Sequence, residues 1–249
     1  MKKQIIRGLA SGLRRFPRLY RFCRAVFRAL SRGIRYRVRK AFQGQAQIFF
    51  VKIGANDGLE GDPLGETLLR DARYRGILVE PIPFLARRLE KNFPDRSRFR
   101  IEPVAVTDST GVARMYYVDE QAARLLGRPV EDWYFEIASL RREHLLKHLP
   151  RGLESVVREL KVACMTFADL MAKNRVQAVD LLHLDTEGHD FVILRQIDFR
   201  RWRPKVVLFE HLHLSEADRG KARQYMEQRG YEVTAFDWDF LCIRAADPR

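Results

Sequence analysis

The sequence predicts an α/β fold with a mainly parallel sheet that carries helices on both faces. Short apolar runs that are typical of buried strands, such as 48–53 and 76–80, alternate with segments of helical spacing, such as 83–92. Two strands close together at the C-terminus, 231–235 and 240–244, indicate an antiparallel edge. A hydrophobic content of 46% with 11% aromatic residues excludes a disordered or collagen-like chain.

Glycine, proline and capping residues mark where these elements begin and end. Gly54 closes the first strand, Pro81 stops the second, Thr166 with Asp169 can cap a helix, and Gly230 ends the last helix. In chain order we expect strands at 48–53, 76–80, 100–106, 112–118, 157–164, 179–185, 205–210, 231–235 and 240–244, and helices at 64–73, 83–92, 167–174, from 191 to 196 and at 216–229. Residues 119–155 are the least regular part of the chain.

The excess positive charge is confined to an N-terminal arm. Residues 1–47 carry 14 of the 46 Lys and Arg residues and none of the 32 Asp and Glu residues, so the rest of the chain is balanced. Apolar residues at steps of three and four from Ile6 to Ile34 predict amphipathic helices, and Pro17 is expected to begin the second, at about 17–40. We therefore divide the chain into a basic amphipathic helical arm, 1–45, and a domain, 46–249.

The arm has several interpretations. Its Arg-rich face opposite Phe and Leu suits an anionic membrane surface, which we favour. The alternatives are a helix that packs on the domain, an organellar transit peptide, and nucleic-acid contact through phosphates, the least favoured. No apolar run in the sequence reaches the roughly 18 residues of a membrane span, and the three cysteines are scattered. We expect a cytoplasmic protein that lies peripherally on the membrane.

The segment Gly54-Ala55-Asn56-Asp57-Gly58 follows the first strand and is a candidate ligand loop. Glycines allow a sharp turn and a close approach of a ligand, and ligands of open α/β sheets bind beyond the carboxyl ends of the strands. The pattern is not the G-x-G-x-x-G of dinucleotide binders, and the Asp57 carboxylate would repel a pyrophosphate. A cofactor without phosphates, such as S-adenosylmethionine, fits better; the alternative is a purely structural turn.

Glu80 ends the second strand, 22 residues after Gly58. An acid at this place can accept hydrogen bonds from both ribose hydroxyls of an adenosine cofactor. Glu80 therefore supports nucleoside binding without choosing the cofactor, and a solvated acid at a strand end is the alternative.

Acidic and imidazole side chains gather after two further strands. Asp185 ends the strand predicted at 179–185, and Glu187, His189 and Asp190 follow it. Bringing these groups together costs free energy unless they face a cleft or pair with one another. Asp185 and Glu187 could orient a substrate hydroxyl, and His189 could take its proton.

The strand at 205–210 ends in Glu210-His211-Leu212-His213, beside the Asp185 loop. His211 and His213 lie on one side of an extended chain, so a metal with Asp185 or Glu210 is conceivable, although we do not expect one. His183 alternates with leucines and is expected in the interior.

Taken together, these segments resemble the FkbM-type methyltransferase family, which uses S-adenosylmethionine. The resemblance rests on FVKIGANDG at 50–58, GILVEPIP at 76–83, AVTDSTG at 105–111, DLLHLDTEGHD at 180–190 and VVLFEHLHL at 206–214. It implies the Rossmann-like class I methyltransferase fold, with a seven-stranded, mostly parallel sheet that has one antiparallel strand. It also implies methyl transfer to an oxygen, on a hydroxyl of a sugar, a glycolipid or a natural product.

The resemblance also assigns roles to residues. The loop would border the methionine part of the cofactor, Glu80 would hold the ribose, Val106 and Asp108 would lie near the adenine, and Asp185, Glu187 and His189 would face the methyl group. The expected cofactor residues are Gly54, Ala55, Asn56, Asp57, Gly58, Glu80, Val106, Asp108 and Asp185, and the expected substrate residues are Glu187, Glu210 and His213. The chain departs from the pattern at Lys52, where many methyltransferases of this fold carry an acid.

Methyl transfer to a hydroxyl requires alignment of the acceptor oxygen, exclusion of water and a base. We predict His189 or His211 as the base, Asp185 as the residue that orients it, and residues 119–155 as the cover of the acceptor. One alternative is a nicotinamide-dependent oxidoreductase on a Rossmann-like sheet, disfavoured because G-x-G-x-x-G is missing. The other is a non-catalytic nucleic-acid-binding protein that uses the arm, disfavoured because the domain carries no net charge.

Overall fold

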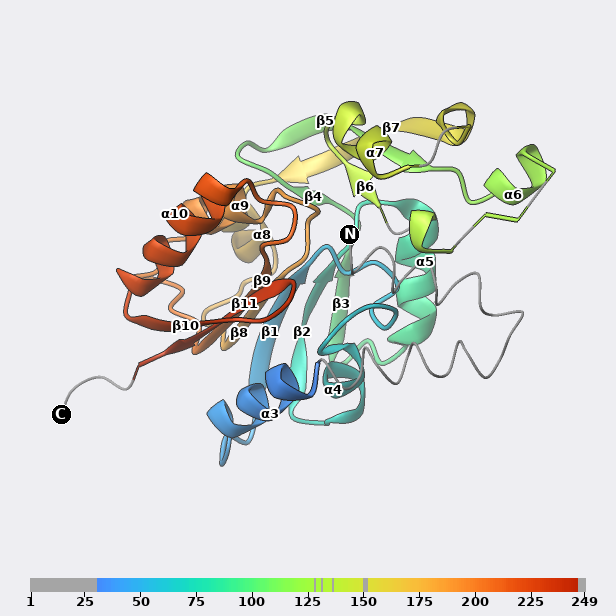
Figure 1. The fold of residues 1–249 in the computed structure, drawn as a ribbon. Coiled ribbons are helices and arrows are strands. Elements are labelled where there is room, and N and C mark those ends of the chain that lie inside the picture. Colours follow the sequence, from blue (N-terminus) through green and yellow to red (C-terminus); the bar gives the residue numbers. More distant parts are fainter. Residues whose placement is uncertain (1–30, 128, 131, 136, 150–151, 246–249) are drawn as a thin grey trace. The chain divides into compact units, whose positions relative to one another are not determined.

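A computed structural model describes residues 31–245 apart from 128, 131, 136, 150 and 151 (Figure 1). The chain divides into two compact units. The sheet unit comprises residues 34–111 and everything from 163 onward, and the inserted unit contains residues 112–162. Most of the predicted arm, residues 1–30, lies outside the described residues.

The sheet unit contains a seven-stranded sheet. Its strands, in spatial order, are β10 (Tyr231–Ala235), β11 (Asp239–Arg244), β9 (Val206–Glu210), β8 (Leu181–Leu184), β1 (Ile48–Ile53), β2 (Tyr74–Val79) and β3 (Phe99–Glu102). β11 is antiparallel to both of its neighbours, whereas the other neighbouring strands are parallel. The predicted seven-stranded mixed sheet with one antiparallel strand is confirmed.

Helices cover both faces of this sheet because its strands are apolar on both sides. Val51 and Ile53 of β1 belong to one core, and Phe50 belongs to the other. The first core includes residues of α8 (Phe167–Lys173), α9 (Asp190–Gln196) and α10 (Glu216–Glu227), and the second includes residues of α3 (Arg32–Ala41), α4 (Gly65–Arg70) and α5 (Pro83–Asn92) (Figure 1). The α/β expectation of helices on both faces is therefore confirmed.

The C-terminal end of the predicted arm packs on the sheet. The apolar face of α3 buries Ile34 and Val38, and Phe42 follows them into the same core. Arg37 on α3 donates a hydrogen bond of 2.7 Å from Nη1 to Thr234 Oγ1 of β10. The apolar face of this part of the arm is therefore occupied by protein. Across residues 31–245, leaving out the five gaps, no helix is long and apolar enough to cross a membrane.

Two predicted elements differ from the structure. The strand expected at 100–106 is interrupted at Pro103, which lacks an N–H for a ladder, so β3 pairs with β2 while β4 (Ala105–Val106) pairs with the end of β7 (Val157–Met165). The helix expected at 64–73 ends at Arg70. Its C-cap, Asp71, has extended backbone angles, and the Asp71 carboxylate accepts the backbone N–H of Arg73 instead.

Other boundaries agree closely. α5 and β1 have the predicted limits, and Thr166 caps α8 by accepting the Asp169 N–H at 3.1 Å, as predicted. These elements are specified by local signals, a strand-ending glycine, a proline at the first helical turn and a capping hydroxyl.

The inserted unit contains most of β5 (Gly111–Val118), close to the strand predicted at 112–118, and short elements in the segment expected to be irregular. These short elements are α6 (Ala122–Leu125), a 3₁₀ turn at Asp132–Phe135, β6 (Ala138–Ser139), α7 (Arg142–His148) and a 3₁₀ turn at Glu154–Val156. β5 and β6 are antiparallel, and Ile137 and Leu145 form a small core with neighbouring aromatic residues. The role of residues 119–155 as a cover for the acceptor stays a prediction.

Candidate functional site

The carboxyl ends of four neighbouring parallel strands carry the residues that the sequence singles out. In register, Ile53 of β1 lies opposite Val79 of β2 and Leu184 of β8, and Leu184 lies opposite Phe209 of β9. β1 is followed by the loop that begins at Gly54, β2 by Glu80 and β8 by Asp185. Glu210 is the last residue of β9. The sheet therefore brings the four predicted segments to one edge.

The glycine loop is packed too tightly for side chains at two positions. Gly54 has a φ of +77°, and a Cβ there would lie 1.9 Å from the Asp185 carbonyl oxygen. Gly58, with a φ of +82°, would meet the ring of Phe93. Asp57 has a structural role, since its Oδ1 accepts the backbone N–H groups of Leu59 and Glu60, each at 2.8 Å. Both glycines are therefore required by close packing on neighbouring protein, which fixes the path of the loop.

Glu80 is buried directly beside this loop. Its Oε2 accepts the Asn56 N–H at 2.8 Å, and its Oε1 accepts the Ile82 N–H at 2.9 Å. Burial raises the pKa of Glu80 to about 7, against the opposing effect of these two hydrogen bonds and of Lys52. A carboxylate oxygen has more than one lone pair, so each can still accept a ribose hydroxyl. Glu80 thus fits the ribose of an adenosine cofactor while it holds the loop to β2.

Val106 and Asp108 are placed by β4 rather than by the seven-stranded sheet. Val106 pairs with Met165 and is buried in the core, whereas Asp108 is exposed. Between them, Thr107 donates its hydroxyl to the Ser109 carbonyl at 2.8 Å, which shapes the turn. Their predicted contact with the adenine stays a prediction.

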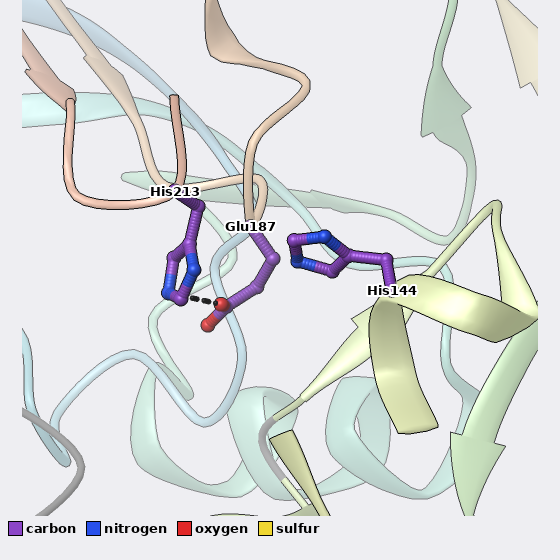
Figure 2. A group of neighbouring side chains, drawn as sticks. All are labelled: His144, Glu187 and His213. Carbon is purple, nitrogen blue, oxygen red and sulfur yellow. Dashed lines mark ion pairs between the residues drawn. The ribbon is translucent and has the colours of Figure 1, made fainter. Parts of the chain in front are cut away.

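An imidazole and three carboxylates cluster after β8 and β9. His213 Nε2 lies 2.9 Å from Glu187 Oε2, the ion pair drawn in Figure 2, and 3.8 Å from Glu210 Oε2. One oxygen each of Asp185, Glu187 and Glu210 lie within 4.8 Å of one another. Such oxygens can also hold a divalent cation, so this is where a metal would fit. Glu187 reaches the cluster from a left-handed backbone position, with a φ of +53°.

The two histidines predicted as bases have different surroundings. His211 is buried, its Nε2 lies 3.0 Å from the Phe236 carbonyl oxygen, and its ring packs on Phe240 at 4.3 Å between centroids. His189 precedes the first turn of α9 and is half-buried. His213, predicted as a substrate residue, lies beside the Glu187 carboxylate, and the spacing of the two residues in the sequence gives no sign of this pairing.

Asp190 is a buried carboxyl for which the sequence predicts no individual role. Its Oδ2 accepts a hydrogen bond from the Thr186 hydroxyl at 2.9 Å. The two residues are only four positions apart, so this local contact could be expected from the sequence. Burial, and then the nearby charge of Asp185, raise the pKa of Asp190 to about 7. Asp190 therefore braces the loop after β8 partly in its neutral form.

We expect Asp190→Asn to stabilise the protein above neutral pH. Because the folded state holds the Asp190 proton more tightly than the unfolded state, this residue lowers stability as pH rises from about 4 to about 7, by up to about 1.4 kcal/mol per pH unit. The amide cannot ionise, so the free energy of unfolding, measured in urea, should change less between pH 5 and pH 8 in the variant than in the wild type. Asp198→Asn, at an exposed carboxylate, is the control. A variant less stable than the wild type at pH 8 would contradict this account.

Three more buried polar groups, Lys52, Asp62 and His183, lie close to one another. Lys52 is 2% exposed and forms an ion pair with Asp62, a residue for which the sequence predicts no role. His183 is 1% exposed, in the interior as predicted, and its Nδ1 lies 4.0 Å from Asp62 Oδ1.

Comparison with known proteins gives one family and several solved structures. The Methyltransferase FkbM domain matches residues 52–233. A solved methyltransferase FkbM from Methylobacillus flagellatus KT is 14% identical, with a TM-score of 0.46 over 79% of this chain and 43% of that one, so this chain spans less than half of its length. No curated protein matches the sequence.

Two further solved structures are similar at the same level. The fibrillarin pre-rRNA processing protein of Methanococcus jannaschii is 12% identical, with a TM-score of 0.42 over 81% of this chain and 68% of that one. The precorrin-6y C5,15-methyltransferase of Geobacter metallireducens GS-15 is 14% identical, with a TM-score of 0.40 over 85% and 88%.

The family match covers most of the sheet unit, including the glycine loop, Glu80 and the cluster around His213. It favours methyl transfer over the nicotinamide-dependent alternative and implies S-adenosylmethionine as the methyl donor. The chain belongs to the FkbM family of S-adenosylmethionine-dependent methyltransferases.

Proposed function

We propose that this protein transfers a methyl group from S-adenosylmethionine to a hydroxyl oxygen of a sugar, a glycolipid or a related natural product. The observation that carries the proposal is the 2.9 Å contact of His213 Nε2 with Glu187 Oε2, at the edge of the sheet that also holds the glycine loop and Glu80. An imidazole oriented by a carboxylate is a general base, and a hydroxyl acceptor is the group that needs one.

The cofactor side of this proposal rests on the loop and on Glu80. When bound, S-adenosylmethionine supplies a methyl group already activated on a sulfonium. Glu80 would accept the ribose hydroxyls, and the backbone from Gly54 to Gly58, whose path is fixed by the two tightly packed glycines, would border the methionine part. Val106 and Asp108 would lie near the adenine.

The acceptor side rests on His213 and the carboxylates. We assign the Nε2–H of neutral His213 as the donor to Glu187, which makes Nδ1 the atom that takes the hydroxyl proton. Glu187 stabilises the imidazolium that results. Asp185 and Glu210 would accept hydrogen bonds from the acceptor. Three carboxylates repel an anionic acceptor, so a neutral polyhydroxyl compound fits best. His189 and His211 stay as alternative bases.

The experiment has two readouts. Calorimetric titration of the full chain with S-adenosylmethionine and S-adenosylhomocysteine, with NAD as the control, tests the cofactor. Transfer of labelled methyl from S-adenosylmethionine to methyl glucoside, methyl rhamnoside and dodecyl maltoside tests the acceptor. We expect binding of both sulfur compounds and a base-stable ether product. Binding of NAD alone would overturn the cofactor, and label recovered only on nitrogen or in a base-labile ester would overturn the hydroxyl acceptor.

We also propose that the basic arm holds the protein on an anionic membrane surface, where a glycolipid acceptor would be found. Its charge supports this, and since the apolar face of α3 is buried, exposed Arg39 and Lys40 would contribute by charge alone. We expect the protein to sediment with phosphatidylglycerol vesicles and to be released at about 1 M salt, where the Debye length falls to about 3 Å. Arg39→Glu/Lys40→Glu should weaken binding. Equal binding to phosphatidylcholine vesicles would contradict an electrostatic contact.

A further inference from the structure

Lys52 is a charged residue in the most buried part of the sheet. It lies on β1 two residues before Gly54, with a side chain that is 2% exposed, and its ammonium group pairs with the Asp62 carboxylate, itself 4% exposed. A buried charge is costly, and a buried ion pair contributes little to stability compared with apolar residues of the same size. The pair therefore needs an explanation other than general stability.

Asp62 joins the ion pair to the start of α4. Its Oδ1 accepts the backbone N–H groups of Leu64 at 2.6 Å and of Gly65 at 2.8 Å. Burial raises the pKa of Asp62, but Lys52, His183 and these hydrogen bonds outweigh it and hold the pKa below its usual value. Asp62 is therefore an ionised group that links Lys52 on one side with the first turn of α4 on the other.

The start of α4 in turn supports the glycine loop. Gly65 packs directly against Gly58: a Cβ on Gly65 would lie 2.0 Å from the Gly58 carbonyl oxygen. The other end of the loop is fixed at Ala55, whose backbone N–H donates to the Val79 carbonyl at 2.9 Å. A continuous series of contacts thus runs from Lys52 before the loop, through Asp62 and Gly65, to Gly58 at the end of the loop.

We propose that Lys52 and Asp62 are positioning residues for the cofactor loop: their ion pair sets the separation between β1 and α4, and so the path of residues 54–58. In this role Lys52 does not touch the cofactor. The proposal rests on the proposed function only in that the loop binds S-adenosylmethionine; the claim about the path of the loop can be tested without any ligand.

The test is a double-mutant cycle. Lys52→Met leaves the Asp62 charge buried without its partner, and Asp62→Asn does the same to Lys52. The double variant removes both charges, while the Asn carbonyl can still accept the N–H groups of Leu64 and Gly65. We expect each single variant to raise the Kd for S-adenosylmethionine by about tenfold or more, and the double variant to return it to within about threefold of the wild type.

Hydrogen exchange of the amides of residues 54–60 gives the ligand-free readout. Exchange should be faster in each single variant and return toward the wild-type rate in the double variant. Lys173→Met, which breaks the ion pair of Lys173 with buried Glu102 elsewhere in the same unit, is the matched control and should change neither readout. All measurements are made at temperatures where circular dichroism shows each variant to be folded.

The outcomes separate the two proposals. In one outcome the wild type binds no S-adenosylmethionine, while loop exchange is still faster in the single variants and restored in the double variant. That result would refute the cofactor assignment and keep the positioning role. A Kd that stays high in the double variant, with normal exchange, would mean that Lys52 or Asp62 touches the cofactor and would overturn the proposal. Single variants with unchanged loop exchange would overturn it as well.

Discussion

Replacing Glu80 by Ala should weaken the binding of S-adenosylmethionine by about 100-fold or more, because the two charge-assisted hydrogen bonds that we propose to the ribose would be lost at once. The carboxylate is buried and held by the Asn56 and Ile82 N–H groups, so it is preorganised before any ligand arrives. Calorimetric titration of the full chain measures the change. The same substitution leaves those two N–H groups without this acceptor, so unfolding in urea must be measured alongside.

Glu80→Gln separates binding from folding. The amide keeps the shape, and its carbonyl oxygen can accept one of the two backbone N–H groups, but its NH2 group cannot accept the other and the side chain cannot ionise. Because the pKa of Glu80 is raised to about 7, the wild type should bind S-adenosylmethionine more tightly as pH rises from 6 to 8, when the carboxyl group becomes mostly ionised. The Gln variant should bind weakly and with no such pH dependence in this range.

The matched control for Glu80 is Glu102→Gln. Glu102 is also a buried acid at the end of a strand, β3, but it pairs with Lys173. Its replacement should leave the affinity for the cofactor unchanged. An equal loss of affinity in Glu102→Gln, or a wild-type affinity that falls as pH rises from 6 to 8, would contradict a ribose contact through Glu80.

Replacing His213 by Ala should lower kcat by about 10²- to 10⁴-fold, the usual contribution of a general base. The affinity for S-adenosylmethionine should stay within about threefold of the wild type, because the role assigned to His213 concerns the acceptor. The assay is transfer of labelled methyl to the acceptor on which the wild type is most active. Added imidazole should restore part of the activity, since it can occupy the space of the missing ring.

Glu187→Gln tests the partner of His213. The amide cannot stabilise an imidazolium, so kcat should fall, and because the two residues act as a unit the double variant should be little worse than His213→Ala. His189→Ala and His211→Ala are the comparisons, each the removal of one histidine from the same edge of the sheet. The acidic limb of the pH–rate profile is the fall in rate as the base becomes protonated. If this limb is lost in His189→Ala or in His211→Ala but kept in His213→Ala, the histidine replaced in that variant is the base, and the assignment to His213 fails.

Local sequence signals were enough for much of this fold. The limits of α5, the capping of α8 by Thr166 and the glycine that ends β1 depend on a proline, a hydroxyl and a glycine that act on neighbouring backbone. The order of such elements predicted a mainly parallel sheet with an antiparallel edge, whereas the seven strands and the single antiparallel strand were implied by the resemblance to the FkbM family. Where the prediction missed, at Pro103 and Asp71, a single residue redirected the backbone within a segment of otherwise suitable pattern.

Short-range sequence patterns mark the strand ends, and so they identify the residues at the carboxyl ends of β1, β2, β8 and β9. Which of these residues meet depends on the tertiary fold. His213 and Glu187 are 26 residues apart, and Lys52 and Asp62 are on opposite sides of the glycine loop. Such pairs depend on the register of neighbouring strands and on how helices pack over them, and no periodicity along the chain encodes that long-range geometry.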